Sequence, residues 1–447
     1  MLIQPGLSLH ETAFDGLDMR PRSSTHLGHV LLQEVSRVRK GLDYIEHHTV
    51  WSVVTSFFFF GSYFCLDRQN LAWFHLREAT TLAQLLGMQE EASYRMPDVV
   101  ESSRRRRLYW LLFCTERAYA LQQHRPLTLH ATIDLPTLED DPSETVELSG
   151  FLHLVKLFRP FDDTFIGLWN KSKTGATTSW LSQMQQQLAD ALPVYLQCTE
   201  CQAVDLKVSL QWLRTMVWQL SISHGFLSSA AADNAMSFKF PIEISRDLVT
   251  ATSNFSQQSM EVHGIGLVEK LFDIACTLTD VISCVPTEEA SFDFGPRDYL
   301  NQLMTLISNL RGGQQRYMPL LMSKINDTMP NAPTYSLPRT LTTESSNMSE
   351  FYESSLSQNS TPDSTESTPF GSPPLSAASA PPAGFGSFQR DLCMTEGPTL
   401  PAFSSGLMTN GSSMSYEDMT ISAPMQMFVD TGVFLAPTGS LKFEEDG

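Results

Sequence analysis

Basic residues are scarce in this sequence. Its 447 residues include 30 lysines and arginines against 49 aspartates and glutamates, which gives a formal net charge of −19. A chain with this balance lacks the basic surface that contacts phosphate groups. The composition therefore argues against a free-standing nucleic-acid binder and against a protein that coats anionic membranes.

Long apolar segments are also missing. The longest one, residues 53–66, is interrupted by threonine, serine and glycine. It is shorter than the ~20 apolar residues that a membrane-spanning helix needs. The first residues show no basic segment followed by an apolar one, which is the pattern of a secretory signal. We therefore expect neither secretion nor a membrane partner.

Cysteine is rare and gives no sign of a disulfide framework. The chain has 7 cysteines, an odd number, and most lie among apolar residues, which predicts reduced, buried thiols in an intracellular protein. Cys198 and Cys201 have the C-x-x-C spacing, but one such pair supplies at most half of a zinc site. Two thiols near a helix end are the favoured interpretation.

Histidines provide no better metal site. The pairs His26 and His29, and His47 and His48, have no acidic or cysteine ligands nearby at a suitable spacing. We expect no metal and no cofactor.

Catalytic motifs are absent as well. The sequence has no Gly-x-Ser-x-Gly elbow, no glycine-rich loop that ends in Gly-Lys-Ser/Thr, and no His-Glu-x-x-His. These motifs place a nucleophile, a phosphate cradle or a zinc ion. The sequence therefore predicts that the protein is not an enzyme.

Helical periodicity is the main feature of the first 330 residues. Four consecutive phenylalanines, residues 57–60, would also suit a buried strand, but their helical neighbours favour a helix. Gly87 stands where a helix C-cap glycine belongs, and Ser102 or Ser103 is a candidate cap for the helix that follows. We predict an all-α fold with helical segments at residues 50–66, 71–86, 102–123, 151–169, 180–195, 204–226, 242–252, 262–283 and 299–322.

Composition divides the chain into three parts. Residues 1–30 are turn-rich and predict a flexible arm, and residues 31–330 predict one helical region. Of the 117 residues from 331 to 447, 55 are Ser, Thr, Pro or Gly, and 13 acids face 3 bases. Such a segment cannot bury enough apolar surface to offset its ordering entropy, which predicts a disordered acidic tail.

The run Arg104 to Arg107 is the one basic cluster. It opens a helix that becomes apolar on all sides, and four adjacent helical residues point in four directions. Structural pairing with acids is the favoured interpretation, because cations near a helix start oppose the macrodipole. The candidate partners are Glu101 and either Glu90 or Glu91. The alternative is a nuclear-import patch.

Aromatic residues in the tail stand beside acids. Phe428, Phe434 and Phe443 lie in or near such clusters, for example Phe443-Glu-Glu-Asp446. Acids keep exposed aromatic side chains soluble, and such a segment can fold into a hydrophobic groove of a partner. These three phenylalanines are the candidate contacts of an activation segment that binds the transcription machinery or a coactivator.

Four motifs, in order, carry a resemblance to a known family. They are Leu71–Met88 (LAWFHLREATTLAQLLGM), Arg104–Arg117 (RRRRLYWLLFCTER), Arg125–Leu129 (RPLTL) and Ile133–Pro136 (IDLP). Residues 50–142 resemble the fungal-specific transcription factor domain, the middle homology region of fungal zinc-cluster regulators. The resemblance implies an all-helical regulatory domain, a nuclear location and control of transcription.

The resemblance also singles out scaffold positions in this chain. They are Trp73, Arg77, Gly87, Arg105, Arg106, Trp110, Glu116, Arg117, Arg125 and Pro126. It implies that these residues hold the domain together more than they contact a ligand.

One part of the family pattern is missing from these residues. The family reads DNA with a six-cysteine zinc cluster, and no window here holds six cysteines. We therefore do not expect direct DNA binding by this chain. The leading interpretation is a pathway-specific activator of a metabolic or secondary-metabolite gene cluster, acting as a homodimer or heterodimer. The alternative is a truncated interaction module that heterodimerises with, or titrates, a full-length zinc-cluster factor.

Overall fold

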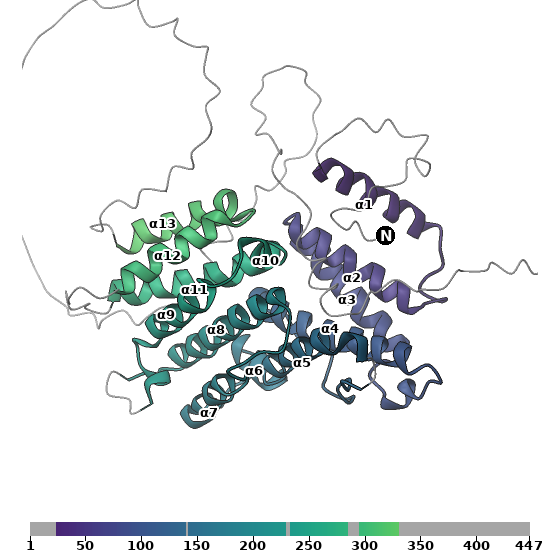
Figure 1. The fold of residues 1–447 in the computed structure, drawn as a ribbon, viewed down its shortest axis with the longest axis horizontal. Coiled ribbons are helices and arrows are strands. Elements are labelled where there is room, and N and C mark those ends of the chain that lie inside the picture. Colours follow the sequence, from purple (N-terminus) through teal and green to yellow (C-terminus); the bar gives the residue numbers. More distant parts are fainter. Residues whose placement is uncertain (1–23, 140–141, 229–232, 285–294, 330–447) are drawn as a thin grey trace, which may run out of the picture.

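The computed structural model describes residues 24–139, 142–228, 233–284 and 295–329. Over these ranges the chain forms helices and no strand, so the predicted all-α class is confirmed. The helices, labelled in Figure 1, are α1 (Ser24–Lys40), α2 (Val50–Cys65), α3 (Gln69–Leu85), α4 (Val99–Gln123), α5 (Thr145–Phe158), α6 (Asp163–Trp169), α7 (Thr178–Ala189), α8 (Glu200–Ser223), α9 (Phe240–Thr252), α10 (Gln257–Glu261), α11 (Gly264–Cys284), α12 (Pro296–Asn309) and α13 (Met318–Thr328). Shorter helical turns lie at Glu91–Tyr94, Pro142–Glu144, Asn234–Met236 and Gly313–Tyr317.

Two of the three predicted parts of the chain lie largely or wholly outside these residues. The described chain begins within the predicted arm, at the start of α1. The predicted tail, with Phe428, Phe434 and Phe443, is not among the described residues.

Helices α2 and α3 form the hairpin that opens the domain. The four phenylalanines lie within α2, so the helical interpretation is confirmed over the strand alternative. The chain turns at Asp67, which has a positive φ of 57°. At the end of α3, Gly87 adopts a φ of +66°, a left-handed conformation that costs glycine little, as the sequence predicts.

Helix α4 is buried along its middle. The residues from Leu108 to Cys114 are each at most 1% exposed, which confirms that this apolar segment faces partners on every side. The helix begins earlier than predicted, because Asp98 caps it by accepting a hydrogen bond from the Glu101 amide at 3.1 Å. The expectation that Ser102 or Ser103 caps this helix is therefore wrong; both lie inside it.

Two predicted segments each contain a pair of helices. Residues 151–169 divide between α5 and α6 around Pro160, which cannot continue a helix smoothly. Asp162 then caps α6 by accepting hydrogen bonds from two backbone amides at 2.8 and 3.0 Å. Residues 299–322 divide between α12 and α13, where Gly312 has a φ of +79°.

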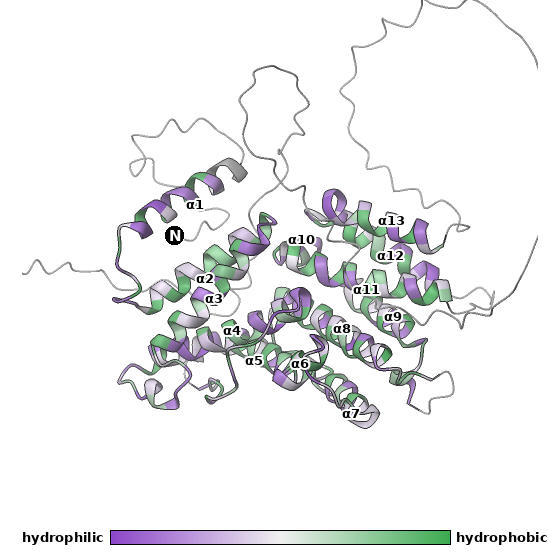
Figure 2. Ribbon diagram, turned by 180° about the vertical axis from the view of Figure 1, so that it is seen from behind, coloured by the Kyte–Doolittle hydropathy of each residue, from purple (hydrophilic) through white to green (hydrophobic). Residues whose placement is uncertain are grey.

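Helix α8 packs against α5, α7, α9, α10 and α11. It lies between α5 and α7 on one side and α9 and α11 on the other (Figure 1). Apolar and polar residues alternate along the helices (Figure 2), and the buried apolar side chains form one cluster. One apolar core thus runs from the α2–α3 hairpin to α13. Among the described helices, none combines the length and apolar character needed to cross a bilayer.

Candidate functional site around Glu116

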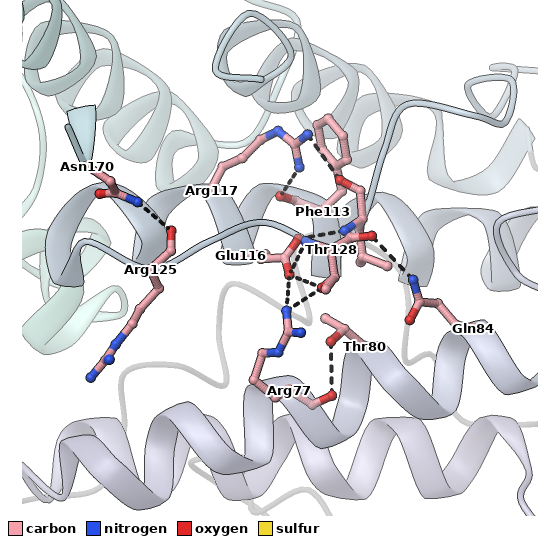
Figure 3. Close-up of polar contacts among 10 residues, drawn as sticks. Arg77, Thr80, Gln84, Phe113, Glu116, Arg117, Arg125, Thr128 and Asn170 are labelled. Carbon is pink, nitrogen blue, oxygen red and sulfur yellow. Dashed lines mark hydrogen bonds and ion pairs between the residues drawn. The ribbon is translucent and has the colours of Figure 1, made fainter. Parts of the chain in front are cut away.

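Glu116 is the centre of a buried polar network (Figure 3). Its side chain, on α4, is fully buried. One carboxylate oxygen, Oε1, accepts hydrogen bonds from the Thr128 amide at 2.9 Å and from the Thr128 hydroxyl, and Oε2 accepts from the Leu129 amide at 2.9 Å. Hydrogen bonds to a carboxylate stabilise its charged form, which is what a buried ion requires.

Arg77 brings α3 into this network. Its Nη1 donates to the Thr128 hydroxyl at 2.7 Å and lies 3.4 Å from Glu116 Oε1. We call Arg77, Glu116 and Thr128 the Glu116 junction. Arg77 lies on α3, Glu116 on α4 and Thr128 in the segment that follows α4, so the Glu116 junction connects these three parts of the chain.

An aromatic ring lies beside the Glu116 junction. The guanidinium groups of Arg77 and Arg125 lie 5.3 and 5.4 Å from the centroid of the Trp73 ring, within cation–π range. The Trp73 ring also stacks on Tyr119 of α4, with centroids 5.7 Å apart and planes at 6°. Three of the four resemblance motifs therefore meet here: the first through Trp73 and Arg77, the second through Glu116, and the third through Arg125.

Arg117 holds the same segment from the other side of α4. It donates to the carbonyl oxygens of Leu129 at 3.2 Å and Phe113 at 3.3 Å, and lies over the Phe113 ring (Figure 3). Burial lowers the pKa of Arg117 to about 10, so the guanidinium is still charged at neutral pH. The neighbouring Glu116 carboxylate opposes this shift and offsets part of the cost of burying the cation.

The arginine run makes contacts at the other end of α4. Arg106 forms two hydrogen bonds with the Glu91 carboxylate, at 2.6 and 2.8 Å, and donates to the Asp134 carbonyl at 3.0 Å. These bonds from Arg106 hold the pKa of Glu91 below its usual range. Of the predicted acidic partners, Glu91 is therefore confirmed for Arg106.

Arg105 departs from the prediction. Its guanidinium donates to the backbone carbonyl of Leu86 rather than to a carboxylate, so an acidic partner is wrong for this residue. The physical reason is the end of α3, where the last carbonyls have no partner within the helix and carry partial negative charge. The Arg105 guanidinium donates to one of these carbonyl groups, and this contact takes the place of a carboxylate partner.

Arg107 makes the most buried contact of the run. Its side chain is 0% exposed and pairs with Glu144, whose side chain is 4% exposed. Sequence reasoning missed this pair, because Glu144 lies just beyond a segment with no helical pattern. One feature of the sequence does indicate that Arg107 is buried and needs a partner: it directly precedes the fully apolar stretch of α4.

The remaining motif residues extend the scaffold without joining the Glu116 junction. The Trp110 indole donates to the Asp134 carbonyl at 3.0 Å, which fixes the segment after α4 near its far end. Gly87 ends α3, and Pro126 follows Arg125 where the chain leaves α4. The motif residues therefore form two groups, one around Glu116 and one around Arg106 and Trp110.

This arrangement suits a structural joint rather than catalysis. Both Glu116 oxygens already accept hydrogen bonds from the protein, which leaves little capacity to take a proton from a substrate. Within the segments that the structure describes, no three His, Cys, Asp or Glu side chains gather as a metal site would require. Cys198 lies just before α8 and Cys201 in its first turn, and both are half-buried.

The Glu116 junction lies inside residues 43–187, which match the family described as "Fungal specific transcription factor domain". The chain carries a fungal specific transcription factor domain. The resemblance seen in the four motifs is therefore confirmed. Because this family consists of transcription factors, the prediction that the protein is not an enzyme is confirmed as well.

The chain is also similar in sequence to several curated fungal proteins. The chain is 28% identical over 283 residues to the "Probable sucrose utilization protein SUC1" of Candida albicans, which covers 62% of this chain and 54% of that protein. It is 26% identical to the "Maltose fermentation regulatory protein MAL13" of Saccharomyces cerevisiae, over 54% of this chain and 50% of that one. It is also 26% identical to the "Respiratory transcription factor ZNF1" of the same yeast, over 50% of each chain.

The chain spans about half the length of the curated relatives that it matches. It is a distant homologue of fungal zinc-cluster regulators. No solved structure matches it.

Proposed function

We propose that this chain acts in the nucleus as a pathway-specific activator of metabolic genes. The observation that carries the proposal is the family match over residues 43–187, inside which the motif residues converge on Glu116 and Arg106. The relatives named for sucrose utilization and maltose fermentation favour genes of carbohydrate use over a secondary-metabolite cluster.

In this proposal the helical region is a regulatory scaffold and the tail makes the activating contact. Residues 331–447 carry 13 acids and 3 bases, and aromatic residues stand among those acids near the end of the chain. The partner is a coactivator or another part of the transcription machinery. The helical region would pair with a second copy or with a zinc-cluster factor, which would supply DNA recognition.

A transferred tail tests the activating contact. Residues 400–447 fused to an unrelated DNA-binding domain are expected to activate a reporter gene. Replacing Phe428, Phe434 and Phe443 together with alanine is expected to abolish that activity, because aromatic burial on the coactivator supplies about 25 cal/mol for each Å² removed from water. The measurement is reporter output normalised to the amount of fusion protein.

A charge variant is the matched control for the aromatic variant. Replacing Glu444, Glu445 and Asp446 with their amides is expected to weaken activation without abolishing it, because these acids keep the aromatic side chains accessible and speed the encounter. A silent but well-expressed fusion would contradict the activator. It would favour instead the alternative of a module that pairs with, or titrates, a full-length factor.

DNA affinity of the chain itself is a separate prediction. We expect the purified 447-residue chain to bind duplex DNA weakly at physiological salt, because its net charge of −19 offers few phosphate contacts and little counterion release. Fluorescence anisotropy with labelled duplexes, repeated over a range of salt concentrations, measures this. Sequence-specific binding that survives 150 mM salt, on the order of physiological ionic strength, would contradict it.

A further inference from the structure

A cavity of about 120 Å³ lies between the first and the later helices of the domain. Its walls come from α2 and α4 on one side and from α8 and α11 on the other, with one residue from α5. Its lining includes none of the residues of the Glu116 junction. An apolar cavity of about 150 Å³ holds a benzene molecule, so this space is on the scale of a single ring.

Five aromatic side chains of α2, α4 and α5 contribute to the wall: Phe57, Phe60, Phe64, Tyr119 and Phe158. The ring of Phe60 stacks on Phe57 with centroids 5.8 Å apart, and meets Tyr119 edge-on at 5.6 Å. Phe64 lies 5.8 Å from Phe60 by the same measure, and Phe158 adds a ring from α5. Several of these rings are buried in the core, so the wall is already formed and favours an apolar ring as its occupant.

Three ionisable side chains give the cavity a polar end. Asp205 of α8 accepts hydrogen bonds through Oδ1 from Lys270 at 2.8 Å and from Ser209 at 3.0 Å. Lys270 of α11 also donates to Ser209, at 2.7 Å. His263, just before α11, contacts the Cys201 carbonyl through Nε2 at 2.8 Å. Asp205, Lys270 and His263 all line the cavity.

These contacts leave specific hydrogen-bonding capacity at the polar end. The second carboxylate oxygen of Asp205, Oδ2, accepts no hydrogen bond from the described residues. Because a carbonyl only accepts, His263 carries its proton on Nε2 and presents Nδ1 as an acceptor. Lys270 has three N–H groups, of which two are used. A hydroxyl group, which both donates and accepts, matches this set.

The charges at the polar end cancel. Burial would raise the pKa of Asp205, but the ammonium group of Lys270 holds it below its usual value, so the carboxylate is ionised beside that group. Burial lowers the pKa of His263, which keeps the imidazole neutral at neutral pH. An uncharged occupant therefore fits better than an anion or a cation.

We propose that this cavity binds a small, neutral molecule that consists of one apolar ring and a hydroxyl group. The ring lies against Phe57, Phe60 and Tyr119, and the hydroxyl group donates to Asp205 and accepts from Lys270. Because the walls belong to helices far apart in sequence, such a ligand holds α2 and α4 against α8 and α11. This proposal does not depend on the proposed function in transcription, and ligand binding can be tested without measuring transcription.

Phenol and toluene are the matched probes, because they have nearly the same shape and differ by a hydroxyl in place of a methyl group. Isothermal titration of the full chain is expected to show saturable phenol binding at one site, at least about 10-fold tighter than toluene, since hydrogen bonds to a charged group favour the hydroxyl. A cavity that offered only apolar contact would prefer toluene. Equal or tighter binding of toluene, or no saturable binding of phenol, overturns the proposal.

A cavity-filling variant locates the site. Ala118 lines the cavity from α4, and Ala118→Leu is expected to lower phenol affinity at least about 10-fold by occupying the space. The control is Ala189→Leu, at the exposed end of α7, which should leave binding unchanged. Should Ala118→Leu fail to fold, Gly266→Ala replaces it, because its added Cβ meets Phe64 at an ordinary 4.0 Å. Unchanged phenol affinity in the folded filling variant overturns the assignment.

Discussion

Replacing Glu116 with alanine is expected to lower the free energy of unfolding by about 3–5 kcal/mol, because several donors lose their acceptor at about 1–3 kcal/mol each. The carboxylate is fully buried and accepts hydrogen bonds from the Thr128 amide and hydroxyl and the Leu129 amide. Its loss leaves these donors without an acceptor, and Arg77 without its counter-charge. Urea unfolding followed by circular dichroism measures the change.

Two further variants separate charge from hydrogen bonding. Glu116→Gln keeps one acceptor oxygen and the shape of the side chain, so it should cost less than Glu116→Ala. Glu90→Gln removes a charge from an exposed side chain near the end of α3, and should change the free energy of unfolding by less than about 0.5 kcal/mol. A Glu116→Ala protein as stable as the unmodified chain would show that the Glu116 junction does not hold the domain together.

Local pattern was enough to predict most of the helices. The apolar stretch from Leu108 to Cys114 predicted a helix buried on all sides, and the position of Gly87 predicted the left-handed end of α3. These features depend on residues close together in sequence, where periodicity and backbone preference act directly. The two divided segments follow from the same kind of local effect, because Pro160 and Gly312 interrupt the helical pattern.

The partners in the polar network could not be predicted in the same way. Thr128 lies 12 residues from Glu116 and 51 from Arg77, in a segment without helical periodicity. No local rule selects this hydroxyl among the others in the chain. The resemblance motifs supplied Arg77 and Glu116 as scaffold residues, but only the packing of α3 against α4 places Thr128 between them.

The charged residues at the cavity escaped prediction for a related reason. Asp205 and Lys270 lie on two helices, 65 residues apart, and each has another charged residue close by in sequence, Lys207 and Glu269. A buried ion requires a partner. The sequence does not state which charge on which helix is that partner; the pairing of α8 with α11 decides it.

The second large loss of stability is expected on replacement of Arg107, in the arginine run. Arg107→Ala is expected to destabilise the chain by about 3–5 kcal/mol, because it leaves Glu144 buried without a counter-ion. Arg106→Ala should cost less, on the order of 1 kcal/mol, because the Glu91 side chain is 40% exposed and regains water when its partner is removed. The order of the two effects follows from the exposure of the acids and not from the arginines themselves.

A double replacement tests whether Arg107 and Glu144 stabilise the domain as a pair. It also tests whether the arginine run has a structural role or serves nuclear import. Arg107→Met combined with Glu144→Leu removes both charges and keeps apolar volume, so its stability should return to within about 1 kcal/mol of the unmodified chain. Chemical unfolding of both single variants and the double variant gives the coupling free energy. If Arg107→Ala unfolds like the unmodified chain but a fluorescent fusion leaves the nucleus, the run serves import. If instead the single variants are unstable and the double variant recovers, Arg107 is a structural residue of the helical domain.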